Sequence, residues 1–254
     1  AGGAGGEKPQ EARLQKVAFS SAHCLIEPFG IAADDASGVL FVTDRKGKSV
    51  CLITLSFDAD DQLIEGSTIE RLAEFGTEPR GVAVASPAAL VVAVGSSVEV
   101  VSRNPSILQQ RQVAVAVPGA TICGVAFCGQ DLFFANQTGN AVLRAKRSGT
   151  SALSFLPPVV VVGGNTAFPT GIPAEGTAKQ TKLWGPTFLI PMGSRSTALI
   201  MNSGADTSTG MPAVLLLTDA FPFVCDVMPA TLTLADIVGL SADSTYHARN
   251  LVHA

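Results

Sequence analysis

The stretch from Glu27 to Leu55 decides how this chain folds, and it reads EPFGIAADDASGVLFVTDRKGKSVCLITL. Three runs of apolar and β-branched residues, at 29–33, 39–43 and 49–55, are separated by segments rich in turn-forming residues. This pattern predicts three short antiparallel strands joined by tight turns. Because a sheet this small cannot bury its own apolar face, the unit must stack against copies of itself.

The layout returns three more times along the chain. Each copy has one reference position in its first strand. In chain order these positions are Gly30, Gly81, Gly124 and Phe188. Fourteen residues later, or twelve in the shorter third copy, comes the turn that follows the second strand, with Asp44, Gly95, Asn136 and Asn202. We expect the first strands of the copies to be Phe29–Ala33, Arg80–Ala85, Ile122–Phe127 and Thr187–Pro191. The valine run at 159–162 is expected to open the fourth copy.

These residues resemble a known repeat. The segment Pro-Phe-Gly-Ile-Ala at 28–32, a second strand that ends in Asp or Asn, and a third strand are similar to the NHL repeat. The segment from Gly163 through Glu175 to Leu183-Trp-Gly-Pro186 is similar to the linker between NHL blades. The resemblance implies an all-β fold, a β-propeller or partial propeller built from four-stranded antiparallel blades around a central channel.

The repeats also suggest how the chain is divided. Residues 14–239 are expected to form the NHL-like blades, of which about four can be recognised. Residues 1–13 are rich in Gly and Ala and lack periodicity, which predicts a flexible lead. Residues 240–254 are expected to be a C-terminal extension or the start of a missing blade.

The distribution of charge favours a protein partner. The net charge is −4 and no basic cluster is present, which argues against nucleic acid as the main partner. Residues 1–80 carry 21 charged side chains, whereas residues 81–254 carry only 17. We therefore expect residues 81–254 to supply most of the surface that contacts other subunits and residues 1–80 to face water. The uncharged, Val-rich run at 81–98 is broken by turn residues, so no membrane span is expected.

Residues that could carry chemistry are few. The cysteines, Cys24, Cys51, Cys123, Cys128 and Cys225, are odd in number and scattered, which favours small buried side chains over a disulfide framework. The histidines, His23, His247 and His253, lie outside the repeat strands, so a three-histidine zinc site is not expected. No known catalytic or phosphate-binding motif is present. We expect no cofactor, no metal and no catalytic residue.

The repeated turn residues leave two interpretations open. Asp44, Asn136 and Asn202 could ring a channel as calcium ligands, as in propeller enzymes. More simply, their side-chain oxygens accept hydrogen bonds from backbone N–H groups in the turns. Gly95 in the second copy would break any ring of ligands, which favours the structural role.

Two functions remain in view. The first is a non-catalytic scaffold, a structural subunit of a larger complex that binds other protein subunits. Trp184, Phe221 and Phe223 are its candidate partner-binding residues, because aromatic side chains dominate protein interfaces; Trp184 could instead be a packing anchor between blades. The alternative is a six-bladed-propeller enzyme, such as a calcium-dependent lactonase or a strictosidine-synthase-like hydrolase or lyase.

Overall fold

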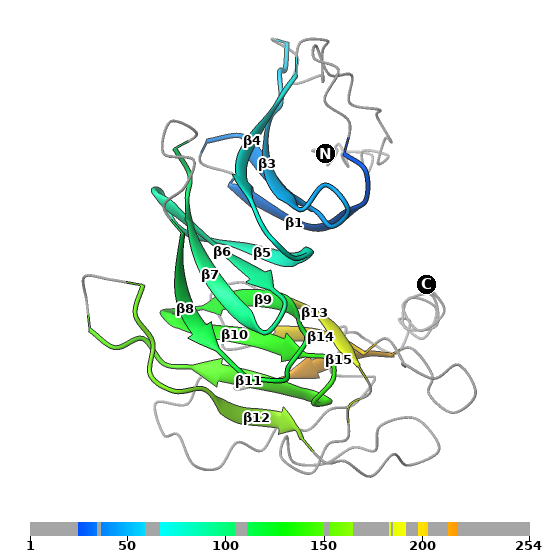
Figure 1. The fold of residues 1–254 in the computed structure, drawn as a ribbon, viewed down its shortest axis with the longest axis vertical. Coiled ribbons are helices and arrows are strands. Elements are labelled where there is room, and N and C mark those ends of the chain that lie inside the picture. Colours follow the sequence, from blue (N-terminus) through cyan, green and yellow to red (C-terminus); the bar gives the residue numbers. More distant parts are fainter. Residues whose placement is uncertain are drawn as a thin grey trace, which may run out of the picture.

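A computed structural model describes most of the repeat region as strands and their connecting turns (Figure 1). The described residues are 25–34, 37–58, 67–104, 111–149, 153–164, 183, 185–191, 198–202 and 213–217. They form four antiparallel sheets, each made from strands that follow one another in the sequence. We call these sheets blades 1 to 4, in chain order.

The strands of each blade pair in sequential order. Blade 1 contains β1 (Pro28–Asp34), β2 (Val39–Asp44), β3 (Ser49–Thr54) and β4 (Thr68–Glu74). Blade 2 contains β5 (Pro79–Ser86), β6 (Ala89–Val94), β7 (Ser97–Ser102) and β8 (Arg111–Ala116). Blade 3 contains β9 (Ile122–Cys128), β10 (Asp131–Asn136), β11 (Ala141–Ala145) and β12 (Val159–Gly163). The described part of blade 4 contains β13 (Pro186–Pro191), β14 (Ala198–Asn202) and β15 (Ala213–Leu217).

The expected first strands of the four copies are confirmed as β1, β5, β9 and β13. In the strand pairing, Ile31 lies opposite Val42 in blade 1 and Val82 lies opposite Val92 in blade 2. One assignment was wrong. The valine run at 159–162 does not open the fourth copy; as β12 it pairs with β11 and is the outer strand of blade 3.

The blades stack face to face through their apolar side chains. One buried cluster joins blades 1 and 2, with Phe41 and Val50 from blade 1 against Val82 and Leu90 from blade 2. A second cluster joins blade 2 to blade 3 and contains Val91 and Val98 from the former, with Leu132 and Phe134 from the latter. The side chains of β6 therefore alternate between blade 1 and blade 3. A third cluster, which includes Val42 and Ile53, lies on the opposite face of blade 1.

The inner strands β1, β5, β9 and β13 lie side by side, and glycine makes their approach possible (Figure 1). A Cβ atom on Gly30 would overlap the carbonyl oxygen of Arg80, and one on Gly81 would overlap that of Cys123. A Cβ atom on Gly124 would lie 2.8 Å from the Cα atom of Phe188. Each blade thus contacts the backbone of the next one through a residue that has no side chain.

The expected role of Asp44 and Asn136 is confirmed. Both begin four-residue turns that place a glycine at the fourth position, and the N–H groups of Gly47 and Gly139 donate to their side-chain oxygens at 3.0 Å. The residue after each glycine has a left-handed backbone, with φ of 48° at Lys48 and 50° at Asn140. The backbone of Asn202 ends β14, as its spacing predicted.

Within the described residues, no helix is long and apolar enough to cross a membrane.

The first testable prediction concerns the glycine contacts. Gly81→Ala is expected to lower the free energy of unfolding by about 1–3 kcal/mol, because the added methyl group meets backbone atoms that cannot rotate away. Gly76→Ala is the matched control, since a Cβ atom there has no neighbour within 4 Å. Urea denaturation of both variants measures the difference. Equal stability of the two variants would contradict the proposed close contact.

Candidate functional site

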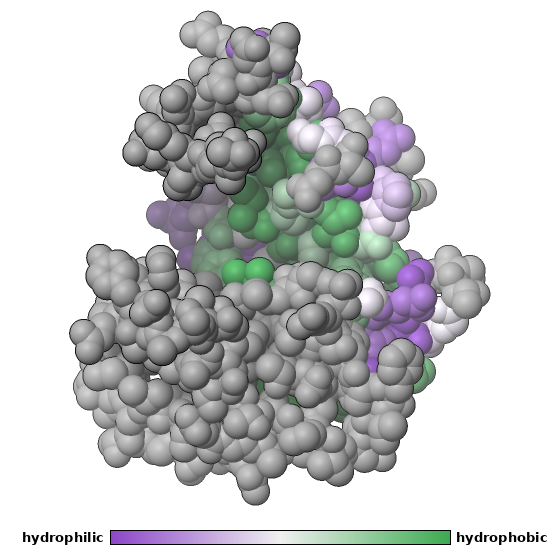
Figure 2. Space-filling view, turned by 180° about the vertical axis from the view of Figure 1, so that it is seen from behind, coloured by the Kyte–Doolittle hydropathy of each residue, from purple (hydrophilic) through white to green (hydrophobic). Residues whose placement is uncertain are grey.

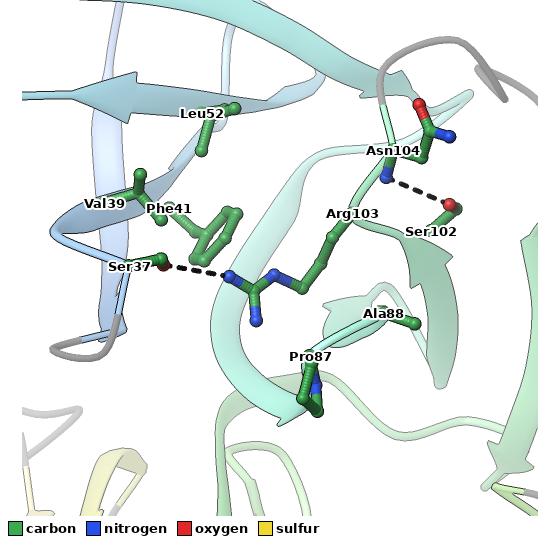
Figure 3. Close-up of a pocket in the computed structure, with 9 residues that line it drawn as sticks. All are labelled: Ser37, Val39, Phe41, Leu52, Pro87, Ala88, Ser102, Arg103 and Asn104. Carbon is green, nitrogen blue, oxygen red and sulfur yellow. Dashed lines mark hydrogen bonds between the residues drawn. The ribbon is translucent and has the colours of Figure 1, made fainter.

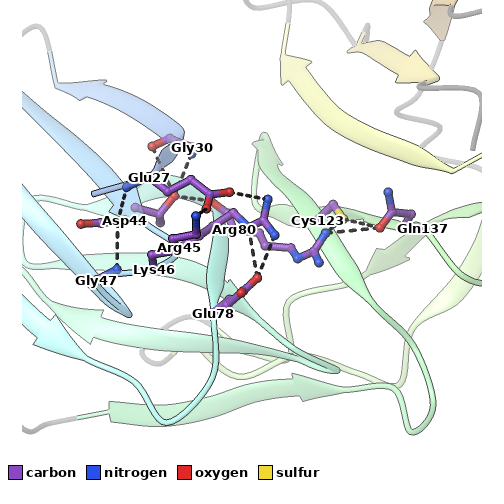
Figure 4. A network of polar contacts seen from close by, with 11 residues as sticks. Glu27, Gly30, Asp44, Arg45, Lys46, Gly47, Glu78, Arg80, Cys123 and Gln137 are labelled. Atoms are coloured by element: carbon purple, nitrogen blue, oxygen red, sulfur yellow. Dashed lines mark hydrogen bonds and ion pairs between the residues drawn. The ribbon is translucent and has the colours of Figure 1, made fainter. Parts of the chain in front are cut away.

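The candidate site lies at one end of the inner strands, where the turns after the second strands and the linkers between blades meet (Figure 4). Blade 1 contributes Glu27 and the turn from Asp44 to Gly47. Glu78 and Arg80 come from the start of blade 2, and Cys123 and Gln137 come from blade 3. Three blades therefore build this group of side chains, which we call the axial cluster.

Asp44 anchors the cluster to the backbone. Its buried carboxylate accepts hydrogen bonds from the N–H groups of Ile26 and Glu27, both at 2.8 Å, in addition to that of Gly47. Burial raises the pKa of Asp44, but the three N–H donors outweigh this and hold the pKa below its ordinary value of 3.8. The carboxylate is therefore ionised at neutral pH and both of its oxygens are used within the fold.

Arg45 is neutralised by carboxylates from two blades. Its guanidinium forms ion pairs with Glu27 and Glu78, both at 2.9 Å. The hydrogen bond from Arg45 is the main reason why the pKa of Glu78 is lowered. The same guanidinium lies 5.2 Å from the centre of the Phe29 ring. Arg45 thus links blade 1 to the start of blade 2.

Arg80 has partners of a different kind. Its terminal nitrogen Nη1 lies 3.2 Å from Sγ of Cys123 and 3.3 Å from Oε1 of Gln137. Its guanidinium carbon lies 5.9 Å from the centre of the Phe29 ring. The backbone carbonyl of Arg80 accepts a hydrogen bond from the Thr43 hydroxyl, which fixes the strand that carries the side chain. The half-buried guanidinium is therefore held in place by neutral groups.

An aromatic pair joins the first and fourth blades beside the cluster. The rings of Phe29 on β1 and Phe188 on β13 stack with their centres 5.2 Å apart and their planes at 22°. Offset stacking of this kind adds about 0.5–1.5 kcal/mol beyond the area that it buries. Phe188 takes the position that glycine has in the other blades, so its ring reaches inward to Phe29.

The described cysteines are poor nucleophiles. Cys51, Cys123 and Cys128 are buried free thiols, which confirms the expectation for these three. Burial raises the pKa of Cys123 despite the neighbouring Arg80, and it raises the pKa of Cys128 to about 11. All three thiols are therefore protonated at neutral pH, the unreactive form.

A groove lies between blades 1 and 2 at the other end of the strands (Figure 3). It has a volume of about 500 Å³, with Phe41 and Leu52 on one side and Pro87 and Ala88 on the other. Arg103 lies over the Phe41 ring at 4.8 Å and forms an ion pair with Asp34. In this groove the arginine fastens the two blades together.

The residues expected to bind partners, Trp184, Phe221 and Phe223, lie outside the described residues, as do Cys24, Cys225 and the histidines. Among the described residues, no group of three or more His, Cys, Asp or Glu side chains is placed to hold a metal ion. The axial cluster itself was missed from the sequence. Arg80 is adjacent to Gly81, the spacing position of the second repeat copy, but its partners, Cys123 and Gln137, are more than 40 residues away.

The second testable prediction concerns Asp44. Asp44→Asn is expected to lower the free energy of unfolding at pH 7 by about 1–3 kcal/mol, because a charged acceptor of three hydrogen bonds is lost. A carboxyl group whose pKa is lowered in the folded state stabilises the fold at pH values above its unfolded-state pKa of 3.8. This stabilisation is lost as the pH falls through the folded-state pKa. The difference between wild type and variant should therefore shrink below pH 4.

Denaturation with urea at several pH values from 2 to 7 measures this difference. Glu70→Gln is the control, because Glu70 is exposed on the outer strand of blade 1. A difference that stays constant down to pH 2 would show that Asp44 does not act through its ionised form.

The sequence matches no family model and no curated protein sequence. Solved structures do resemble the fold. A putative phosphatase from Bacteroides thetaiotaomicron aligns over 86% of this chain and 48% of its own, with 13% identity and a TM-score of 0.52. A streptogramin B lyase aligns over 80% of this chain and 55% of its own, with 13% identity and a TM-score of 0.48.

The β-propeller domain of Cps50 (Swd1) from Myceliophteria thermophila aligns over 81% of this chain and 56% of its own, with 11% identity and a TM-score of 0.45. The chain thus spans about half the length of these structures. At such low identity the resemblance concerns the fold alone. Sequential antiparallel sheets, four-stranded in blades 1 to 3, that stack with their first strands side by side are the arrangement of a β-propeller.

Proposed function

We propose that this chain is a non-catalytic β-propeller unit that binds other protein subunits as a structural part of a larger assembly. The observation that supports it is the exposure of Ile31. This residue follows Gly30 on the inner strand, and the side chain at the same position is buried in each of the other three blades. An inner-strand side chain that is buried in the other three blades but exposed in blade 1 is suited to a partner, while Val42 and Ile53 on the same face of blade 1 are already buried. This contact lies in residues 1–80, which the charge distribution did not favour as a contact surface.

The exposed fractions make the contrast clear. Ile31 is 65% exposed, whereas Val82, Val125 and Leu189 are 6%, 5% and 7% exposed. Val82 packs in the cluster shared with blade 1, and Val125 packs in the cluster shared with blade 2. Each is thus covered by the blade that precedes its own. Ile26, at 66%, is a second exposed apolar side chain next to β1.

The same contacts indicate what would cover Ile31. Val82 and Val125 are each covered by side chains of the preceding blade. The inner-strand glycine of that preceding blade contacts the backbone of the inner strand that carries Val82 or Val125. A further four-stranded blade with a glycine on its inner strand would therefore fit against Gly30 and Ile31. Burying a side chain such as isoleucine contributes about 1.5–3 kcal/mol, which favours such docking. Figure 2 shows hydrophobic residues gathered across the middle of one face of the described part.

The geometry of the axial cluster favours binding over the alternative, a six-bladed-propeller hydrolase or lyase. Such an enzyme needs ligands or nucleophiles that point into the channel. Here Asn136 accepts a hydrogen bond within its own turn, Asp44 accepts from its turn and from the segment before β1, and the thiol of Cys123 is protonated. Elemental analysis with assays on lactone and ester substrates distinguishes the two functions. A stoichiometric calcium or zinc ion with turnover would favour the enzyme.

The repeat pattern supports an NHL type for the blades, and Trp184, Phe221 and Phe223 remain the proposed aromatic contacts with partner subunits. Residues 81–254 carry few charges, which suits the centre of an interface.

The third testable prediction concerns Ile31. Without its partner blade, the isolated chain is expected to self-associate at high concentration, because the apolar surface next to β1 is exposed. Ile31→Lys should reduce this association, since burying a lysine there is unfavourable. Val113→Lys is the matched control, because Val113 is 55% exposed on β8, the outer strand of blade 2.

Size-exclusion chromatography with light scattering measures the mass of each variant, and circular dichroism checks that it is folded. A wild-type chain that stays a compact monomer at high concentration would overturn the proposed role of this surface.

The fourth testable prediction concerns the aromatic residues. Trp184→Ala and the double variant Phe221→Ala/Phe223→Ala are each expected to weaken self-association by tenfold or more, the range of interface hot spots. Sedimentation equilibrium measures the association constant. Variants that are folded and associate like the wild type would remove these residues from the interface.

A further inference from the structure

The polar contacts of Arg80 differ from those of most other arginines in the described part of the chain. Five of those arginines form an ion pair with a carboxylate: Arg45, Arg71, Arg103, Arg111 and Arg144. No such pair is found for Arg80 within the described ranges. The two hydrogen-bond partners of its side chain are a thiol and an amide, which carry no negative charge.

The nearby carboxylates are already engaged. Glu78 accepts two hydrogen bonds from Arg45, at 2.9 Å and 3.1 Å. Asp44 uses both of its oxygens for backbone N–H groups. Turning either carboxylate toward Arg80 would therefore break existing contacts. The positive charge of Arg80 is balanced only at a distance, and a bound anion would supply a direct partner.

The surroundings of Arg80 suit a carboxylate. A guanidinium offers a planar set of N–H donors that matches the two oxygens of a carboxylate. Oε1 of Gln137 holds the guanidinium in place, and the amide nitrogen of Gln137 is a further donor on the same side of the cluster (Figure 4). The Phe29 ring and the half-buried position reduce the access of water, which strengthens charge-assisted hydrogen bonds.

We propose that Arg80 and Gln137, beside the Phe29 ring, bind the side-chain carboxylate of an Asp or Glu in an acidic segment of a partner protein. This inference rests on the proposed protein-binding function and adds the chemistry that one contact recognises. A carboxylate carries a single negative charge, which matches one arginine without an ion-pair partner. A phosphate group carries about −1.5 to −2 at pH 7 and would call for a second cation, whereas Arg45 is already paired with Glu27 and Glu78.

The fifth testable prediction uses fluorescent octapeptide pools in which one position is fixed and the others are mixed. At one or more positions, pools with Asp or Glu are expected to bind at least tenfold more tightly than pools with Asn or Gln, as measured by fluorescence polarisation. Arg80→Gln should abolish this preference, and Gln137→Ala should reduce it. Arg111→Gln should leave it unchanged; Arg111 also lies over a phenylalanine, Phe75, but has Glu99 as its partner.

The controls separate this site from the open surface of blade 1. Arg80 holds Thr43 through its backbone carbonyl, so replacing its side chain leaves that hydrogen bond in place, and circular dichroism checks folding. Ile31→Lys should change association but leave the preference for acidic peptides intact. The inference is overturned if acidic pools bind no better than neutral ones, if Arg80→Gln keeps the preference, or if phosphoserine pools bind most tightly.

Discussion

The close approach of the inner strands is the constraint on which the rest of the structure depends. At Gly30, Gly81 and Gly124, the space that a side chain would need is filled by the backbone of the next blade. This contact sets the distance between neighbouring sheets, and the distance decides which side chains interdigitate in the clusters between blades. It also brings Arg80 of blade 2 within reach of Cys123 and Gln137 of blade 3. The axial cluster is thus a consequence of the glycine contacts.

Two ways of satisfying charge occur side by side in that cluster. Asp44 is satisfied by backbone N–H groups, and Arg45 by two carboxylates. Both arrangements join parts of the fold and use up the bonding capacity of the groups involved. Arg80 is also held in place, but its partners are neutral. Its positive charge therefore remains available to pair with a bound anion. The difference separates structural charges from one suited to recognition.

The sequence allowed much of the fold to be predicted, because turn residues and strand periodicity are local signals. Turn residues between apolar runs predicted the pairing of β1 with β2, and the residue type of Asp44 predicted the use of its side chain in the turn. The valine run of β12 was placed in the wrong blade because a long connection separates it from β11, so spacing gave no guide. The Phe29–Phe188 stack and the partners of Arg80 join residues far apart in sequence, which local patterns do not reveal.

The sequential order of strands within each sheet has a consequence for how the chain folds. Each strand pairs with the one before it, so every ladder closes through a connection between neighbouring strands and costs little chain entropy. Apart from the stack of Phe29 on Phe188, the main contacts between blades likewise join units that are adjacent in the chain. A blade can therefore form soon after it leaves the ribosome and serve as a template for the next one. The outer strand of a blade is the last to be synthesised, so β12, which follows a longer connection than the other strands of blade 3, is expected to be added last in that blade.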